Sequence, residues 1–214
     1  MVEADTSLRE QLFSRLTEAS RAWLDGALAA PIEARSFATS FALAGRKLKG
    51  EASPSPASTP GEMEWLVQDA PVEELGRVLL LIDAARRVGV GAADLVGECY
   101  RQGDGKEKRA VLRGLSLLPQ PERFVDVAVN ACRTSVQTVF EAIACENPYP
   151  ERHFPDASFN QMVLKSLFVG TPLERIRGLA ARTTDELRRM AQGYASERRA
   201  AGRSVPEDID RFLT

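Results

Sequence analysis

The stretch TVFEAIACENPYPERHFPDASFNQMVLKSLFVG, residues 138–170, places a polar and aromatic loop between two apolar helical runs. The loop contains His153, the single histidine of the chain, together with Asn147, Tyr149 and Asp156. Asn147 precedes a proline, and because the residue before a proline avoids helical geometry, we expect the first helix to end there. If the protein has a functional site, this loop and the start of the following helix are where we expect it.

The sequence on both sides of this stretch is also helical in pattern. Apolar residues recur at steps of three and four, and no segment alternates convincingly as a strand would. Near Ser135 we expect a break between two helices, with Ser135 as the cap of the second. After the loop, Phe159, Leu167 and Phe168 are expected on the packed face of a helix. The pattern therefore predicts an all-α protein.

Three helical segments echo one another. They start at Val111, Val139 and Val163, which are 28 and 24 residues apart, and each leads to a proline near a Glu-Arg pair. These spacings are shorter than the roughly 40–47 residues of HEAT or armadillo units. We interpret them as stacked antiparallel helices that resemble a compact HEAT-like α-solenoid. The alternative is that any all-helical chain produces such echoes by chance.

The N-terminal quarter predicts a separate helical hairpin over residues 1–49. One apolar stripe runs from about Thr6 to Ala29, and a second helix follows Pro31 as far as Leu48. Residues 50–61 read GEASPSPASTPG and predict an exposed linker, because so many prolines and small polar residues cannot pack a core. Residues 62–214 are then the helical-stack domain.

Composition limits the classes of function. The chain has 214 residues with a formal net charge of −2, so it lacks the basic excess of a general nucleic-acid or anionic-membrane binder. Its three cysteines are widely spaced and show no CxxC pair, which favours buried free thiols in a reducing compartment. No signal-peptide core and no run long enough to span a membrane is present. We expect a cytoplasmic protein.

Catalytic and metal chemistry have little support in the residues. A metal site could combine His153 with Glu146, Glu151 and Asp156, but zinc and di-iron sites usually need more histidines or thiolates. Cys145 and His153 could meet as a nucleophile pair, although Cys145 lies on an apolar helix and suits a buried thiol better. We expect neither a metal nor a cofactor.

Motifs for nucleotides and diphosphates are also missing. No GxSxG, GxxxxGK[ST] or GxGxxG string occurs. Asp83 and Asp94 are isolated, so the acid pairs that hold magnesium diphosphate in isoprenoid enzymes are hard to find. The paired arginines at positions 86–87, 188–189 and 198–199 fit solvated helix faces, and a phosphate-binding role for them is weakly supported.

The second half of the chain resembles the EboA family over about residues 131–203. The residues that carry the resemblance are Asn147-Pro148-Tyr149-Pro150, His153-Phe154, Phe159-Asn160-Gln161-Met162-Val163-Leu164-Lys165, Ile176 with Gly178-Leu179, and the segment from Tyr194 to Arg203. The resemblance implies a place in a bacterial secondary-metabolite gene cluster, beside a UbiA-like prenyltransferase, a TatD-like hydrolase and sugar-phosphate cyclase relatives. It implies an accessory role in making or exporting a metabolite and carries over no catalytic residue.

Two hypotheses follow. The leading one is a non-catalytic scaffold that binds a protein of its own pathway, either a membrane prenyltransferase or a soluble enzyme, through a helix-lined groove. The competing one is a small enzyme or carrier that holds a hydrophobic, isoprenoid-like metabolite, with His153 as the acid–base or hydrogen-bonding group. The candidate partner or ligand residues are Asn147, Tyr149, His153, Phe154, Asn160, Gln161 and Lys165. A structural role for the same loop, as a rigid plug of the core, is the third interpretation.

Overall fold

A computed structural model describes residues 2–50, 63–67 and 70–212 of the chain. Within these ranges the regular structure consists of α-helices and 3₁₀ turns, and the extended pairing is a single bridge between Leu16 and Gly50. The predicted all-α class is therefore confirmed. Most of the predicted linker, residues 51–62, lies outside the described residues.

Three helices, rather than the expected two, make up the N-terminal part: α1 (Val2–Arg15), α2 (Glu18–Ala29) and α3 (Ala34–Lys47). The predicted single helix from Thr6 to Ala29 is interrupted at Leu16 and Thr17. Thr17 is extended (φ −65°, ψ 159°), and its hydroxyl accepts a hydrogen bond from the Ser20 amide. The Thr17 amide donates to the Lys49 carbonyl at 3.1 Å, so the break joins this segment to the end of α3.

The next helices surround α5 (Val72–Val88), which is buried along most of its length. It packs against α1 and α3 on one side and against α6 (Ala92–Gln102) and α7 (Gly105–Gly114) on the other. The short helix α4 (Glu64–Val67) precedes it. Because helices on both sides of the predicted linker share this contact, they contribute to one hydrophobic core. The division into a hairpin domain and a stack domain stays a prediction.

Shorter helices continue the chain. They are α8 (Val125–Ala131), α9 (Gln137–Ala144), α10 (Pro148–His153), α11 (Asp156–Val169), α12 (Leu179–Arg182) and α13 (Asp185–Ala200), with 3₁₀ turns η5 (Leu173–Arg175) and η6 (Glu207–Phe212). The expected break before α9 is present. The residue at its N-terminal cap is Val136, without a side-chain hydrogen bond, rather than Ser135.

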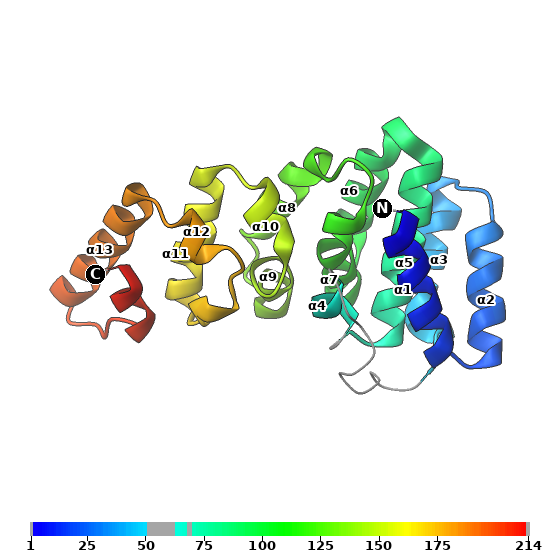
Figure 1. The fold of residues 1–214 in the computed structure, drawn as a ribbon, viewed down its shortest axis with the longest axis horizontal. Helices are drawn as coiled ribbons and strands as arrows, with labels where there is room; N and C mark the ends of the chain where they lie inside the picture. The colour runs from blue at the N-terminus through cyan, green and yellow to red at the C-terminus, as the bar shows by residue number, and fades with distance from the viewer. Residues whose placement is uncertain (1, 51–62, 68–69, 213–214) are drawn as a thin grey trace.

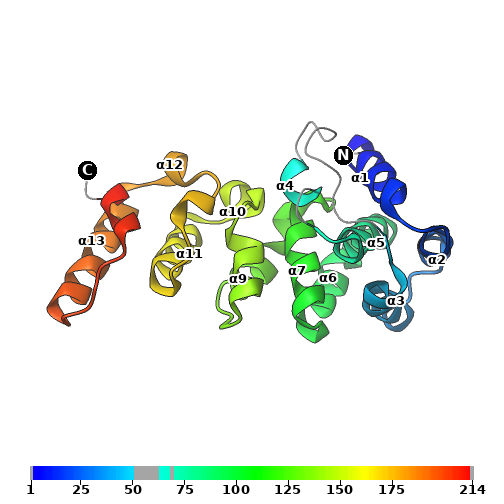
Figure 2. The same cartoon turned by 90° about the horizontal axis from the view of Figure 1, so that it is seen from below.

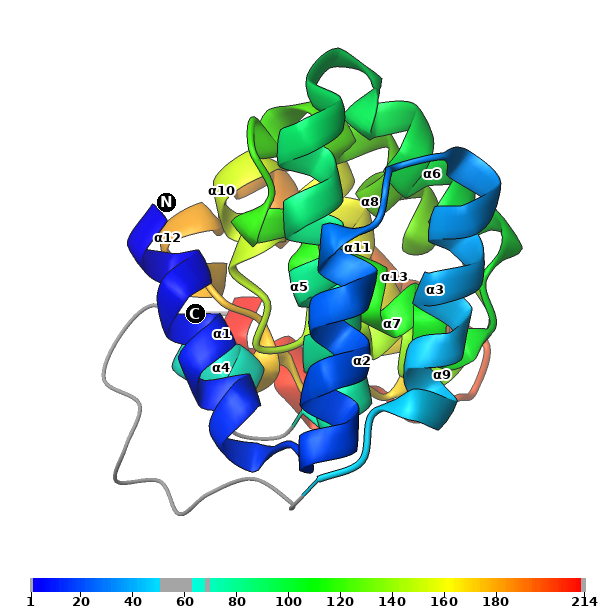
Figure 3. The ribbon, with the colours of Figure 1, turned by 90° about the vertical axis from the view of Figure 1, so that its right-hand side faces the viewer.

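The elements follow one another along the long axis of the molecule in nearly their order in the chain (Figure 1). The N-terminal helices lie at one end, and α13 with η6 at the other. Seen from below, α7, α9, α11 and α13 lie in one row, and α10 and α12 both lie along the upper edge of that row (Figure 2). The view along the axis shows α1, α2 and α3 against the end of the stack (Figure 3). A HEAT-like α-solenoid arrangement stays a prediction.

Candidate functional site

The loop predicted after Asn147 contains the short helix α10, and Asn147 is its cap. The Asn147 side chain is buried and accepts a hydrogen bond from the Tyr149 amide at 2.9 Å. Its amide group donates to the carbonyls of Leu112 (3.1 Å) and Ala142 (2.9 Å). Asn147 therefore joins three helices and is fully occupied with backbone partners.

The aromatic residues of this segment are also part of the core. Tyr149 and Phe154 are buried, and the Tyr149 hydroxyl donates to the Pro121 carbonyl at 2.6 Å. Burial raises the pKa of Tyr149 well above its usual value. The two rings meet edge to face with their centroids 6.3 Å apart. These contacts support the structural interpretation for Asn147, Tyr149 and Phe154.

His153 lies half-buried on this cluster, with its ring centroid 4.8 Å from that of Tyr149. Burial lowers the pKa of His153, opposed by the nearby Glu122 carboxylate. The described part of the chain forms five sizeable surface cavities, and His153 lines none of these five. The predicted pocket under the loop, with His153 as its acid–base group, finds no support in these cavities.

The described residues also give no support to a metal site or to a Cys145–His153 nucleophile pair. In the part of the chain that the structure describes, no group of three His, Cys, Asp or Glu side chains could hold a metal ion. Cys145 is buried, and burial raises the pKa of its thiol to about 12. A thiol with that pKa is protonated at neutral pH, so Cys145 does not supply the thiolate that a Cys–His pair requires.

The remaining candidates, Asn160, Gln161 and Lys165, lie on α11. Asn160 is buried, and its Oδ1 has no hydrogen-bond partner among the described residues. Gln161 is exposed and Lys165 is half-buried, and both line a cavity of about 590 Å³. Two of the seven predicted residues therefore share one surface, while four others are buried and His153 lies elsewhere.

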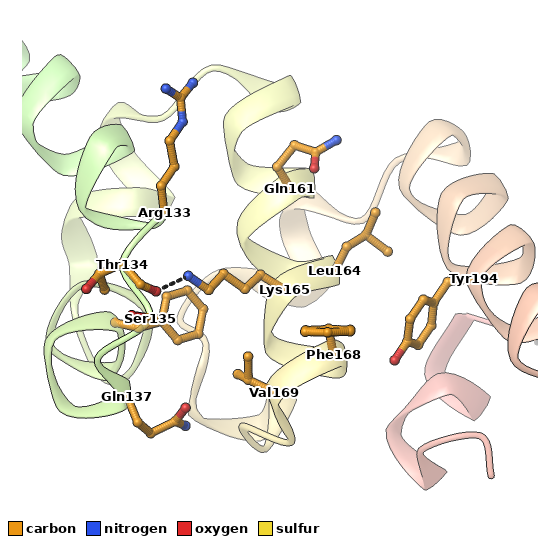
Figure 4. A pocket seen from close by; sticks show the side chains of 11 residues that line it. Arg133, Thr134, Ser135, Gln137, Gln161, Leu164, Lys165, Phe168, Val169 and Tyr194 are labelled. Atoms are coloured by element: carbon orange, nitrogen blue, oxygen red, sulfur yellow. Dashed lines mark hydrogen bonds between the residues drawn. The ribbon is translucent and has the colours of Figure 1, made fainter. Parts of the chain in front are cut away.

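We call this surface the α9–α11–α13 groove, after the helices that form it (Figure 4). Its lining residues are Arg133, Thr134, Ser135, Gln137, Phe140, Gln161, Leu164, Lys165, Phe168, Val169 and Tyr194. Phe168 of α11 and Tyr194 of α13 point into the same space (Figure 4). A neighbouring cavity of about 530 Å³ shares Arg133, Gln161 and Lys165, and it extends the surface to Ala157 and Ser158.

The groove follows from how the helices are spaced. α9 packs closely on α7, and α11 packs on α13, but α9 and α11 approach each other less closely than either pair. Lys165 bridges the gap, since its ammonium group donates to the carbonyls of Cys132 and Thr134 beyond the end of α8. Figure 4 shows the bond to Thr134. The same group lies 4.7 Å from the centre of the Phe140 ring. Burial lowers the pKa of Lys165.

Other polar contacts hold the two sides of the gap together. Arg175 pairs with Glu141 (3.0 Å) and Glu146 (2.8 Å) on the α9 side. Gln137 of α9 donates to the Thr171 hydroxyl at 2.9 Å. These contacts add polar links between the two sides of the gap to the apolar core that both share.

The sequence of the chain matches a known protein family. A family model described as metabolite traffic protein EboA matches residues 4–214. This chain belongs to the EboA family. The match extends over the first half, which the sequence resembled only loosely. Searches of curated proteins and of solved structures gave no match for this EboA-family chain. None of the helices in its described part is long and apolar enough to cross a membrane.

The sequence interpretation missed most of the groove of this EboA-family chain. Phe168 was expected to pack inward, but 69% of its surface is exposed. The signal was present in α11, where Leu164 and Phe168 form a second apolar stripe beside the buried stripe of Phe159, Val163 and Leu167. A helix with one buried face does not need both stripes. The other lining residues come from separate elements, and only the fold brings them together.

A third cavity, of about 170 Å³, lies on the opposite flank of α9 and is polar. It is lined in part by Trp65, Arg109, Arg113, Cys145 and Arg175. Each of its arginines already has a carboxylate within 4 Å, from Glu74, Glu141 or Glu146. The buried Arg113 also donates to the carbonyls of Trp65 (2.7 Å) and Leu66 (3.2 Å). This cluster holds α4 against α5 and α7, so we assign it a structural role. Two further cavities, of about 570 and 370 Å³, adjoin η5 and η6 near the C-terminal end.

Proposed function

We propose that this EboA-family chain is a non-catalytic accessory protein of metabolite traffic that binds a protein of its own pathway through the α9–α11–α13 groove. The family description supplies the general role. The observation that carries the proposal is the exposure of Phe168 inside a groove that three helices form. Covering a side chain of this size stabilises a complex by roughly 1.5–3 kcal/mol.

Exposed apolar side chains are few and concentrate near the groove. Among the described residues, the large hydrophobic side chains that are exposed are Val90 (85%), Val136 (51%) and Phe168 (69%). Val136 lies between two residues that line the groove, Ser135 and Gln137. Since contiguous exposed apolar surface marks interaction sites more often than single residues do, the groove is the favoured interface.

A second candidate function is a carrier that binds a hydrophobic metabolite in the same groove. Its supporting observation is size, because about 590 Å³ lies in the range of ligand sites, roughly 300–1,000 Å³. In this version Phe168, Leu164 and Lys165 would contact the metabolite, and His153 would not. We favour the protein partner, since the groove is open to solvent and small-molecule sites usually enclose most of their ligand.

The test is a comparison of three tagged proteins recovered from native cells: the wild type, Phe168→Asp and Val90→Asp. Mass spectrometry then identifies the proteins and small molecules that come with each. Val90 is the matched control because it is exposed and lies in the turn after α5, away from the groove. We expect a pathway protein with the wild type and Val90→Asp, and its loss with Phe168→Asp.

Two results would count against the proposal. If Phe168→Asp still retains the partner, the interface lies outside the groove. A small molecule that accompanies the wild type without any protein, and that Phe168→Asp loses, would favour the carrier. Circular dichroism of each variant checks that the exposed substitutions leave the helices intact.

A further inference from the structure

The shape of the groove indicates what kind of segment it can accept. Its residues on α11 recur along one stripe, at positions 157–158, 161, 164–165 and 168–169. From position 157 to position 169 there are twelve residue steps, which rise about 18 Å in an α-helix, so the stripe covers more than three turns. Segment 133–137 borders one side and Tyr194 of α13 the other. An open groove of this length between helices suits another helix, which would lay one face into it.

The charges of the groove indicate which helix fits. Arg133 and Lys165 line both cavities, and no carboxylate is among the described residues that line either one. Lys165 is occupied by the carbonyls of Cys132 and Thr134. The Arg133 side chain is exposed, and within the described ranges its guanidinium has no hydrogen-bond or ion-pair partner. The groove therefore offers one free cation beside an apolar floor.

We propose, on the basis of the function proposed above, that the partner docks as an amphipathic helix with an acidic flank. Its apolar stripe packs on Leu164, Phe168, Val169 and Tyr194, and a carboxylate of its flank pairs with Arg133. A second copy of the chain is a poorer occupant, because a twofold contact through this groove would bring like charges, Arg133 and Lys165, toward their own copies.

The experiment uses the full chain and a displayed library of helical peptides about 18 residues long, five turns of helix. Each peptide carries an apolar stripe, with Glu, Lys and Gln supplied equally at the flanking positions. The library is selected on the wild type, Arg133→Glu, Phe168→Asp and Val90→Asp, and sequencing gives the ratio of Glu to Lys in the bound fraction.

We expect Glu to exceed Lys by about tenfold on the wild type and on Val90→Asp. The preference should reverse on Arg133→Glu, and no stripe should be enriched on Phe168→Asp. Equal enrichment of Glu and Lys on the wild type would overturn the acidic flank. A selection unaffected by Phe168→Asp would overturn the docking site. Light scattering tests for a dimer. A concentration-dependent dimer that Phe168→Asp abolishes would show that a second copy of the chain occupies the groove.

The two proposals can fail separately. If Phe168→Asp loses a partner from cells but the library shows no charge preference, the partner interface stands and the acidic helix does not. If the library behaves as expected while the protein recovered from cells carries no protein partner, the proposed function fails although the groove accepts acidic helices.

Discussion

Tyr149 joins two roles in one side chain. Its ring is completely buried beside those of His153 and Phe154, and its hydroxyl donates to the Pro121 carbonyl at 2.6 Å. A hydrogen bond of this kind contributes about 0.5–1.5 kcal/mol, so the hydroxyl adds to what burial of the ring contributes. The aromatic residue that looked like a ligand contact from the sequence therefore serves to fix α10 in place.

We predict that Tyr149→Phe lowers the free energy of unfolding by about 1 kcal/mol, because it removes the hydrogen bond from the buried side chain to the Pro121 carbonyl. Urea unfolding followed by circular dichroism measures the change. Tyr194→Phe is the matched control, since Tyr194 is only half-buried and its hydroxyl accepts one long contact from Arg198 at 3.4 Å. We expect the control to change stability by no more than about 0.5 kcal/mol. Equal effects of the two substitutions would contradict the assignment.

Single residues also show how far the sequence could lead. The burial of Tyr149 and Phe154 was predictable, because aromatic residues beside a helix end often plug cores. The helix expected to end at Asn147 ends at Ala144, and Asn147 instead caps the start of α10. The exposure of Phe168 had one weak sequence signal, the second apolar stripe of α11, but packing was favoured because an apolar residue on a helix is packed far more often than exposed. Arg133 carried no signal, because the role proposed for it depends on the carboxylates that its surroundings in the fold lack.

At the scale of elements, the ends of the helices depend on contacts distant in the sequence. The break between α1 and α2 is stabilised by a bond from Thr17 to Lys49, which no local pattern reveals. Periodicity alone favoured one continuous helix there, since the apolar residues of both helices fall on one stripe. In contrast, α11 ends at Gly170 as predicted, because that residue adopts the left-handed conformation (φ +77°) that glycine tolerates best.

Two glycines give opposite predictions for the same substitution. Gly193 lies within α13, and a Cβ there would meet nothing within 4 Å. Gly193→Ala should therefore raise stability by about 0.5–1 kcal/mol. Gly178 has φ +72°, and a Cβ there would lie 2.4 Å from the side chain of Glu151. Gly178→Ala should lower stability by about 1–2 kcal/mol or more. Thermal unfolding of both variants checks the signs, and two shifts in the same direction would refute the account.

At the scale of the molecule, the gap between α9 and α11 divides the stack. Helices α5, α7 and α9 pack closely one after another, and α11 packs more loosely on α13. Across the gap, long cationic side chains reach carbonyls and carboxylates, in addition to the apolar core that both sides share. Arg182 of α12 donates to the carbonyls of Pro150 (2.8 Å), Glu151 (3.1 Å) and Phe154 (2.8 Å) and to the Asp156 carboxylate (2.6 Å).

We predict that Arg182→Ala accelerates hydrogen exchange of the amides in α11, α12 and α13 by about tenfold or more, while α5 and α7 are unchanged. The substitution removes four hydrogen bonds that join α12 to α10 and to the start of α11, and hydrogen bonds of a charged group contribute about 1.5–3 kcal/mol each. Arg189→Ala is the control, because Arg189 is highly exposed and pairs only with Glu186 on its own helix. Uniform acceleration along the whole chain would show instead that the stack opens as one unit.

The position of the chain ends has a practical consequence. The C-terminal turn η6 packs on α13, the helix that supplies Tyr194, while the N-terminal helices lie toward the far end of the molecule (Figure 1). A purification tag or fluorescent label at the N-terminus thus leaves the groove accessible. A candidate helix joined to the C-terminus through a short flexible linker would experience an effective concentration of about a millimolar. Such a fusion would make a weak complex stable enough to crystallise as a single chain.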